Sequence, residues 1–146
     1  EFSAWALGAS TMLVSTDLRN MSDIQRRCLY NTEILAINQD KLGAPLSMVV
    51  PPDTSGKQVW ARYLSGNATA IAFYNPNTTS QAIEVSLAGL PYAANETLTH
   101  DSVVQVRDVW NHSDVGSAHG FISTVVHPRS IVVYVLKLMS ERHVGS

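Results

Sequence analysis

The chain has 146 residues, of which 45% are apolar and 15% charged, and its formal net charge is −2 at neutral pH. Ten Lys and Arg against twelve Asp and Glu leave little to neutralise a phosphate backbone, so we expect no nucleic-acid partner. No apolar run approaches the roughly 20 residues that a membrane-spanning helix needs, and we expect no membrane partner. The apolar fraction suits one domain with a core, or one domain plus a remnant of another.

The start of the chain has helical periodicity interrupted by one short apolar run. Phe2, Trp5, Ala6 and Ala9 follow the i, i+3, i+4, i+7 spacing of one helix face. Residues 11–15 then have the length of a buried strand. No capping residue precedes the first helix, as we expect of a helix cut from a longer chain. A lone strand between helices is typical of βα-repeat proteins and needs neighbours from elsewhere.

A capping box predicts the next helix. Ser22 and Gln25 form its S-x-x-Q pattern, and the helix that follows would carry Ile24, Cys28 and Leu29 on one side. Because Cys28 is the only cysteine, no disulfide can close within the chain. We interpret Cys28 as a buried small apolar residue, with half of a bridge to a cysteine elsewhere as the alternative.

A further helical turn is expected at residues 33–37. Thr32 would cap it, and Glu33 would lie at the positive end of its dipole. Pro45, the pair at 51–52 and the turn-forming residues 53–56 then predict a linker.

The remainder alternates like strands, with turn signals at intervals near the roughly 8–12 residues of an antiparallel sandwich or barrel. The expected strands are 59–64, 69–74, 82–87, 96–100, 103–110, 120–126 and 130–138. The last is apolar on both faces, which indicates a central position in the sheet. We therefore predict an α+β chain, with a helical remnant at 1–44, an antiparallel, sandwich-like β domain at 45–139 and a frayed tail at 140–146.

Five Asn-X-Ser/Thr sequons are eligible for glycosylation. They begin at Asn20, Asn67, Asn77, Asn95 and Asn111. Five in so short a chain favour a secreted protein. The alternative is a β protein whose turns use Asn, Ser and Thr for local hydrogen bonds.

No two carboxyl groups of this chain can be assigned from the sequence as a catalytic pair. Asp23, Glu33 and Asp53 occupy cap or turn positions, where local hydrogen bonds account for them. Asp108 lies on a strand face before Trp110, and we interpret it as a structural acceptor rather than an acid or base. The sequence therefore predicts no catalytic residue within this chain.

Three residues of one loop region resemble a metal site only superficially. His112, Asp114 and His119 match none of the zinc-binding spacings, so we interpret them as turn residues near a sheet rim. We expect no metal and no cofactor.

Several aromatic residues could stack on sugar rings if they were exposed. In β-rich domains such residues more often form cross-strand core pairs, and this is our preferred interpretation. The four are Trp60, Tyr63, Tyr74 and Trp110.

Three motifs in the first third of the chain carry a resemblance. Residues 2–7, 15–22 and 34–43, the last including Ala-Ile-Asn-Gln-Asp-Lys-Leu-Gly, resemble the end of the catalytic barrel in glycoside hydrolase family 27. The order and spacing of the motifs match, and the third is the most specific. Looser similarities follow at 59–62, 108–110 and 127–130.

That family contains α-galactosidases and α-N-acetylgalactosaminidases, which have a (β/α)8 barrel followed by an antiparallel β domain. The resemblance implies that residues 1–44 are the last strand and flanking helices of the barrel, with both catalytic aspartates in the missing part. It implies a retaining α-galactosidase that acts on terminal α-linked galactose, with no cofactor. Asp17 and Arg19 would support the residues of the active site without contacting substrate themselves. Alternatively, they would form a structural pair that closes the barrel.

The resemblance leaves several alternatives open. The chain could instead be part of an α-N-acetylgalactosaminidase, or a non-catalytic β domain that binds carbohydrate or a partner. The parent protein would bind its α-galactoside substrate in the barrel that is missing here. Homo-oligomer formation is left open. The expected location is secreted, lysosomal or vacuolar. We also expect the incomplete barrel to leave five apolar residues without neighbours, as an exposed patch prone to aggregation: Phe2, Trp5, Met12, Leu13 and Val14.

Overall fold

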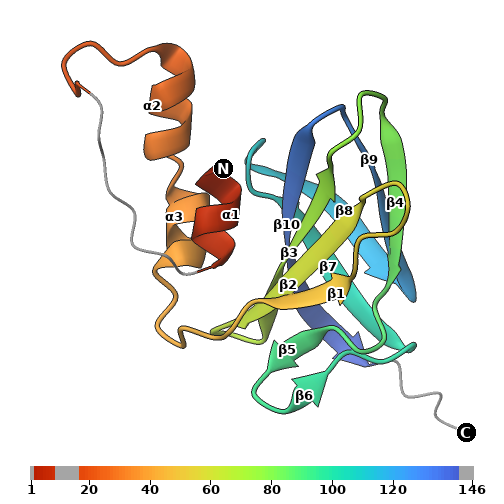
Figure 1. Ribbon diagram of the computed structural model, residues 1–146. Helices are drawn as coiled ribbons and strands as arrows, with labels where there is room; N and C mark the ends of the chain where they lie inside the picture. The colour runs from red at the N-terminus through yellow and green to blue at the C-terminus, as the bar shows by residue number, and fades with distance from the viewer. Residues whose placement is uncertain (1, 9–16, 142–146) are drawn as a thin grey trace, which may run out of the picture.

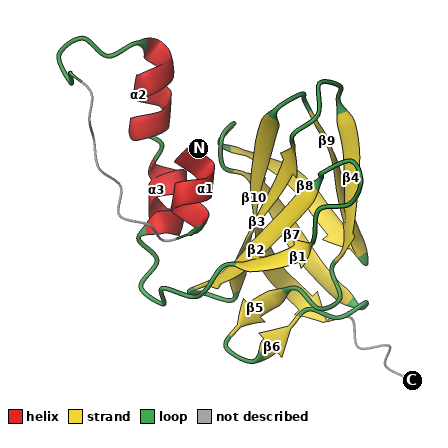
Figure 2. Cartoon of the chain, in the orientation of Figure 1, coloured by secondary structure: helices red, strands yellow, loops and turns green. Residues whose placement is uncertain are grey.

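The computed structural model describes residues 2–8 and 17–141, and within those ranges helices precede strands (Figures 1 and 2). The helices are α1 (Phe2–Leu7), α2 (Asp23–Leu29) and α3 (Thr32–Asn38). The strands are β1 (Ser47–Val50), β2 (Gln58–Leu64), β3 (Ala68–Asn75), β4 (Gln81–Ser86), β5 (Pro91–Ala93), β6 (Glu96–Thr97), β7 (Ser102–Asp108), β8 (Ser113–His119), β9 (Phe121–Val126) and β10 (Ser130–Glu141).

An antiparallel sheet in the order β1-β2-β3-β10-β7-β8 forms the main layer. The last strand is central, as predicted, because β10 pairs with β3 on one side and β7 on the other. Strands β4 and β9 pair in a second sheet, and β5 and β6 form a short hairpin. The predicted α+β class with an antiparallel β domain is confirmed at this level.

The inner core lies between the main sheet and the β4–β9 pair. Alternate residues of several strands point into it, including Ile71 and Phe73 of β3 and Ile83 of β4. Phe73 and Tyr134 pack edge to face, with ring centroids 6.0 Å apart. Burial of apolar side chains, each contributing roughly 1.5–3 kcal/mol, holds the two layers together.

A second core lies on the opposite face of the main sheet, where α1 and α3 cover it (Figure 1). Leu7, Ile34 and Ile37 are fully buried there, against Ala70 and Ala72 of β3. The small alanine side chains let the helices approach the strand closely. The described residues of α1 and α3 therefore share a core with the sheet. The five residues expected to lack neighbours have side chains outside the described part of the chain, so that expectation stays a prediction.

The predicted buried face of α1 is confirmed at the one of its residues whose side chain is described. Ala6 is fully buried, and Ser3 and Leu7 are buried beside it. The side chains of Phe2 and Trp5, together with Ala9 and the expected strand at 11–15, lie outside the described residues.

Helix α2 forms where its capping box predicts but has no buried residue. The backbone amide of Gln25 donates to Ser22 Oγ at 3.2 Å, and the amide of Ser22 donates to Gln25 Oε1 at 2.9 Å. Ile24, expected on a buried side, is 76% exposed. Cys28 is a half-buried free thiol rather than a buried core residue, because α2 stands away from the sheet (Figure 1).

The cap of α3 is Asn31, not the expected Thr32. The Asn31 side-chain oxygen accepts hydrogen bonds from the amides of Glu33 and Ile34, each at 3.1 Å. Asn exceeds Thr in preference for this position, and here it also reaches the sheet.

Three strands were not predicted: β1, β5 and β8. β1 occupies the expected linker at 45–56, and β8 is an exposed edge strand of mostly polar and small residues. Edge strands lack the alternation that burial imposes, so their sequence carries little signal. The strand expected at 96–100 is shorter in the structure, where β6 spans only Glu96–Thr97. The tail expected from residue 140 begins later, because β10 pairs with β7 as far as Glu141. The domain boundary at residue 45 stays a prediction.

Candidate functional site

The most distinctive polar group in the described residues is a buried arginine between the helices and the sheet. Arg62 lies on β2 and has 0% exposure. Its Nη1 donates to the carbonyl oxygen of Leu7 at 3.0 Å, and its Nη2 donates to that of Ile37 at 2.6 Å. These carbonyls lie at the C-terminal ends of α1 and α3, where helix dipoles favour a cation. One side chain of the sheet therefore holds two helix ends.

Asp40 adds an anchor beside this arginine. Its Oδ2 accepts hydrogen bonds from the amide of Ser65 at 2.9 Å and from Ser65 Oγ at 2.6 Å, and its Oδ1 accepts from the amide of Leu42 at 3.1 Å. Burial raises the pKa of Asp40, but these hydrogen bonds and the charge of Arg62 outweigh it and hold the pKa below its usual range. Burial lowers the pKa of Arg62, and the charge of Asp40 opposes this.

Asn31 connects the other end of α3 to the sheet. Besides capping the helix, it donates from Nδ2 to the carbonyl oxygen of Val109 at 3.0 Å, and it is only 3% exposed. A single amide thus satisfies two helix donors and one strand-end acceptor inside the interface.

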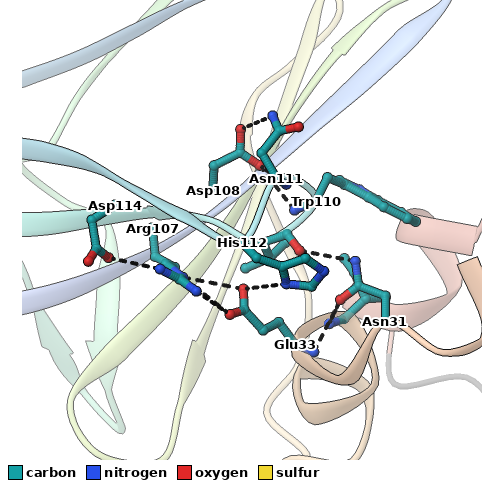
Figure 3. Close-up of polar contacts among 10 residues, drawn as sticks. Asn31, Glu33, Arg107, Asp108, Trp110, Asn111, His112 and Asp114 are labelled. Carbon is teal, nitrogen blue, oxygen red and sulfur yellow. Dashed lines mark hydrogen bonds and ion pairs between the residues drawn. The ribbon is translucent and has the colours of Figure 1, made fainter. Parts of the chain in front are cut away.

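An ionic cluster lies at the rim of the same interface (Figure 3). Arg107 of β7 donates to Glu33 of α3, with Nη2 2.7 Å from Oε1 and Nε 3.2 Å from the same oxygen. Asp114 of β8 binds Arg107 Nη1 at 3.4 Å, and His112 Nδ1 lies 3.6 Å from Glu33 Oε2. The hydrogen bond from Arg107 to Glu33 is the main cause of a raised pKa at Arg107.

Asp108 organises the turn beside this cluster, which confirms its interpretation as a structural acceptor. Its Oδ1 accepts from the amides of Trp110 at 3.0 Å and Asn111 at 3.1 Å, and its Oδ2 accepts from Asn111 Nδ2 at 2.8 Å (Figure 3). The turn directs the indole of Trp110 towards α1, where Nε1 donates to Ser3 Oγ at 3.0 Å.

Asp17 and Arg19, the predicted supporting residues, form one exposed turn. The amide of Arg19 donates to Asp17 Oδ1 at 3.0 Å, and Arg19 Nε lies 3.3 Å from that oxygen. The backbone hydrogen bond from Arg19 is the main cause of the lowered pKa of Asp17. Their side chains are 49% and 89% exposed, so the contacts described are those of a local turn. A role at an active site stays a prediction.

The five sequon asparagines lie at the surface to different degrees. Four are exposed, whereas Asn77 is half-buried and donates from Nδ2 to the carbonyl oxygen of Ser55 at 2.8 Å. Asn67 and Asn95 have positive φ angles of 56° and 62°, which are typical of turns. Exposure makes modification of these side chains sterically feasible.

The four aromatic residues are partly exposed and do not form cross-strand pairs in the inner core, although Trp110 packs against the helix-facing core. Tyr74 is 36% exposed, and Trp60, Tyr63 and Trp110 are half-buried. The inner-core pair uses Phe73 and Tyr134 instead. A reason is that Trp60 and Tyr74 share the helix-facing side of the sheet, which α1 covers only in part.

Among the described residues, no group of three or more His, Cys, Asp or Glu could hold a metal ion. Asp114 and His119 belong to the edge strand β8 rather than to a turn, and Asp114 is paired with Arg107. No described helix is long and apolar enough to cross a membrane.

Arg62 and Asn31 were missed as site residues. Arg62 lies one position after the inward-facing Ala61, so strand alternation places it on the helix-facing side with Trp60. That alternation was a usable signal for its side of the sheet. Nothing in the sequence indicated which carbonyl groups it would meet.

An antiparallel β sandwich with helices packed on one outer face defines the class of protein. Residues 54–136 match the family described as the α-galactosidase C-terminal β-sandwich domain. The chain belongs to this family, and the resemblance to glycoside hydrolase family 27 is confirmed.

Relatives extend this match beyond the sandwich. An α-galactosidase from Coffea arabica is 38% identical over 138 residues, which cover 92% of this chain and 34% of the relative. One from Cyamopsis tetragonoloba is 33% identical, covering 92% of this chain and 31% of the relative. The chain thus spans about a third of the length of these relatives.

Solved structures show the same fold. The α-galactosidase I of Mortierella vinacea has a TM-score of 0.83 at 17% identity, covering 96% of this chain and 34% of that protein. The α-galactosidase of Saccharomyces cerevisiae, solved with raffinose, has a TM-score of 0.79 at 17% identity, covering 94% of this chain and 42% of that protein. At this identity the likeness concerns the fold alone.

Proposed function

We propose that this chain is the C-terminal third of a retaining α-galactosidase that hydrolyses terminal α-linked galactose. The main support for this proposal is the match to the Coffea arabica relative over 92% of the chain. This match extends past residues 54–136 into the helical segment. The catalytic aspartates lie outside this chain in the proposal. The chain itself contributes the β sandwich and the helices that attach it to the catalytic part.

The helical segment is, in this proposal, the end of a (β/α)8 barrel. Support comes from the order of α1, α2 and α3 and from the residues at 34–43 that resemble the family. Arg62 and Asn31 support a fixed orientation of the segment: Arg62 of the sandwich binds the ends of α1 and α3, and Asn31 at the start of α3 binds the Val109 carbonyl of the sandwich. Asp17 and Arg19 would then lie at the barrel face on which active sites are built.

Two alternatives are distinguished by experiment. An α-N-acetylgalactosaminidase from Gallus gallus is 27% identical over 140 residues, so the sugar is not decided by this part of the chain. A free-standing β domain that binds carbohydrate is the second alternative, and its candidate residues are Trp60 and Trp110.

The test compares the purified chain with the longer polypeptide from the same reading frame. The longer protein should hydrolyse an aryl α-galactoside, and the chain alone should not. Preference for an aryl α-N-acetylgalactosaminide would favour the first alternative, whereas an upstream sequence that encodes no barrel would overturn the proposal. Saturable glycan binding by the chain, lost in Trp60→Ala or Trp110→Ala, would favour the second.

The five sequons support a secreted, lysosomal or vacuolar location in this proposal. Expression in a eukaryotic secretory host should add glycans at Asn20, Asn67, Asn95 and Asn111, and enzymatic removal should lower the apparent mass. Asn77 should be the least occupied, because it is half-buried whereas the other four asparagines are exposed. No mass change would argue against secretion.

A further inference from the structure

A pocket lies between α2 and the turn that joins β7 to β8. Its volume is about 370 Å³, within the range of roughly 300–1,000 Å³ that small-molecule sites occupy. Helix α2 and its C-terminal end form one wall, which includes Arg26, Arg27 and Tyr30. The turn forms the other wall, with Trp110 and His112. The pocket therefore has the size of a site for a small ligand.

The turn side of the pocket is held in place by contacts within the protein. The carboxylate of Asp108 accepts a hydrogen bond from the amide of Trp110 (Figure 3). The indole Nε1 of Trp110 donates to Ser3 Oγ at 3.0 Å. Asn31, which also lines the pocket, is only 3% exposed and donates to the carbonyl oxygen of Val109. Because these groups are already fixed, a ligand would lose little affinity to the ordering of this wall.

The α2 side of the pocket carries positive charge. Arg26 and Arg27 lie in the last turn of α2 and are exposed, and among the described residues neither forms a salt bridge. No Asp or Glu belongs to the described lining of the pocket. Glu33 lies nearby, but it contacts Arg107 at 2.7 Å and His112 at 3.6 Å. Two guanidinium groups therefore line the pocket without a carboxylate partner.

The lining groups restrict the chemistry of a ligand. A guanidinium group binds a carboxylate through two parallel hydrogen bonds. Trp110 is half-buried and Tyr30 is 67% exposed, so both offer flat apolar surface to a ring. A neutral sugar would leave the arginines unpaired, and an inorganic anion would leave the aromatic surfaces uncovered. The combination suits a sugar ring that carries a carboxylate.

We propose that this pocket binds a uronic acid unit of an acidic oligosaccharide. The carboxylate pairs with the guanidinium groups of Arg26 and Arg27, and the sugar ring packs against Trp110. All of these residues belong to this chain, so the site does not depend on which sugar the parent protein cleaves.

Isothermal titration with trigalacturonate tests the proposal in the 146-residue chain and in the longer protein. The fully methyl-esterified trisaccharide is the matched control, because it has the same sugar rings without the charges. The ester should bind about tenfold more weakly than the acid, since its charge-assisted hydrogen bonds are lost. Binding of the acid should also weaken as salt is added.

The thiol of Cys28 reports whether the ligand occupies this pocket. Cys28 is the only cysteine of the chain, is half-buried and lines the pocket. At a trigalacturonate concentration about ten times its Kd, the reaction of Cys28 with iodoacetamide should slow about tenfold, because only the free protein reacts. The rate is measured on the proteolytic peptide that carries Cys28. The methyl ester at the same concentration should slow the reaction much less.

A pair of double variants tests the role of the arginines. Arg26→Gln combined with Arg27→Gln should weaken trigalacturonate binding about tenfold. Arg19→Gln combined with Arg129→Gln is the matched control, because it removes the same charge from two exposed positions outside the pocket. The control should leave the Kd unchanged. Both double variants should keep the thermal midpoint of the parent chain, since all four side chains are exposed.

The same affinity for the acid and its ester, or the same effect of the two double variants, would overturn the inference. Inorganic phosphate that protects Cys28 as well as trigalacturonate does would also overturn it, because charge alone would then be bound. Binding in the chain but not in the longer protein would show that the rest of that protein covers the pocket, and would overturn it too. Binding in both proteins would support the inference and is compatible with the proposed function. A longer protein without a barrel would defeat the proposed function instead.

Discussion

Arg62 Nη2 lies 2.6 Å from the carbonyl oxygen of Ile37, so a strand of the sandwich directly holds the end of a helix outside it. The same guanidinium binds the carbonyl oxygen of Leu7 in a second helix. Because the contact is fully buried, separating the helices from the sheet would break both charge-assisted hydrogen bonds and expose the apolar core around them.

Arg62→Met should lower the free energy of unfolding by about 2–4 kcal/mol, because it removes charge-assisted hydrogen bonds worth roughly 1.5–3 kcal/mol each and relieves some desolvation. Urea denaturation measures the loss. Arg19→Met is the control, since Arg19 is 89% exposed, and it should change stability little. Equal effects of the two variants would show that Arg62 does not hold the interface.

Asp40→Asn should reduce the fall in the free energy of unfolding that accompanies a decrease in pH. The folded-state pKa of Asp40 is held below its unfolded value, so Asp40 stabilises the fold above about pH 4. This contribution is lost as pH falls through the lowered pKa. The variant should be less stable by about 1–2 kcal/mol at pH 7, and the gap should narrow below pH 4.

Unfolding midpoints between pH 2 and pH 7 measure this effect. Asp101→Asn, at an exposed turn, should follow the wild-type profile. A stability gap for Asp40→Asn that stays constant across this range would contradict the assigned role of Asp40.

Asn31→Ala should destabilise the chain by about 1–3 kcal/mol, because it removes a helix cap and a buried link to Val109. Ser22→Ala removes the cap of α2, which buries no residue in the structure. Its effect on global unfolding should be under about 0.5 kcal/mol. If both variants cost the same in urea denaturation, α2 is packed more tightly than the structure shows.

Arg107→Gln should lower the thermal midpoint more at low salt than at high salt. Arg107 joins Glu33 of α3 to the sheet at the half-exposed rim, where ions screen the interaction. Asp114→Asn should have a smaller effect, since its contact with Arg107 is longer, at 3.4 Å. Salt-independent effects of Arg107→Gln would contradict an electrostatic role.

Strand alternation made much of the sandwich predictable, because Ile71, Phe73 and their neighbours must face an inner core. The capping box at Ser22 and Gln25 likewise predicted the start of α2. Edge strand β8 gave no such signal, since most of its side chains are exposed and place no constraint on their identity. The catalytic part of the family lies outside the chain in our proposal, so no reading of these residues could supply it.

The contacts of the site were the least predictable. Arg62 and Asn31 bind backbone carbonyl groups 25 to 78 residues away in the sequence, and backbone acceptors have no sequence signature. The resemblance instead drew attention to Asp17 and Arg19, whose described contacts are local.

Native-state hydrogen exchange tests most directly whether the helices and the sandwich form one cooperative unit. Amides of α3 and of β10 should exchange with the same free energy of opening, within about 1 kcal/mol, as urea is raised towards the unfolding transition. Arg62→Met should lower both values together. Opening of α3 at a free energy well below that of β10 in the wild-type chain would contradict the account.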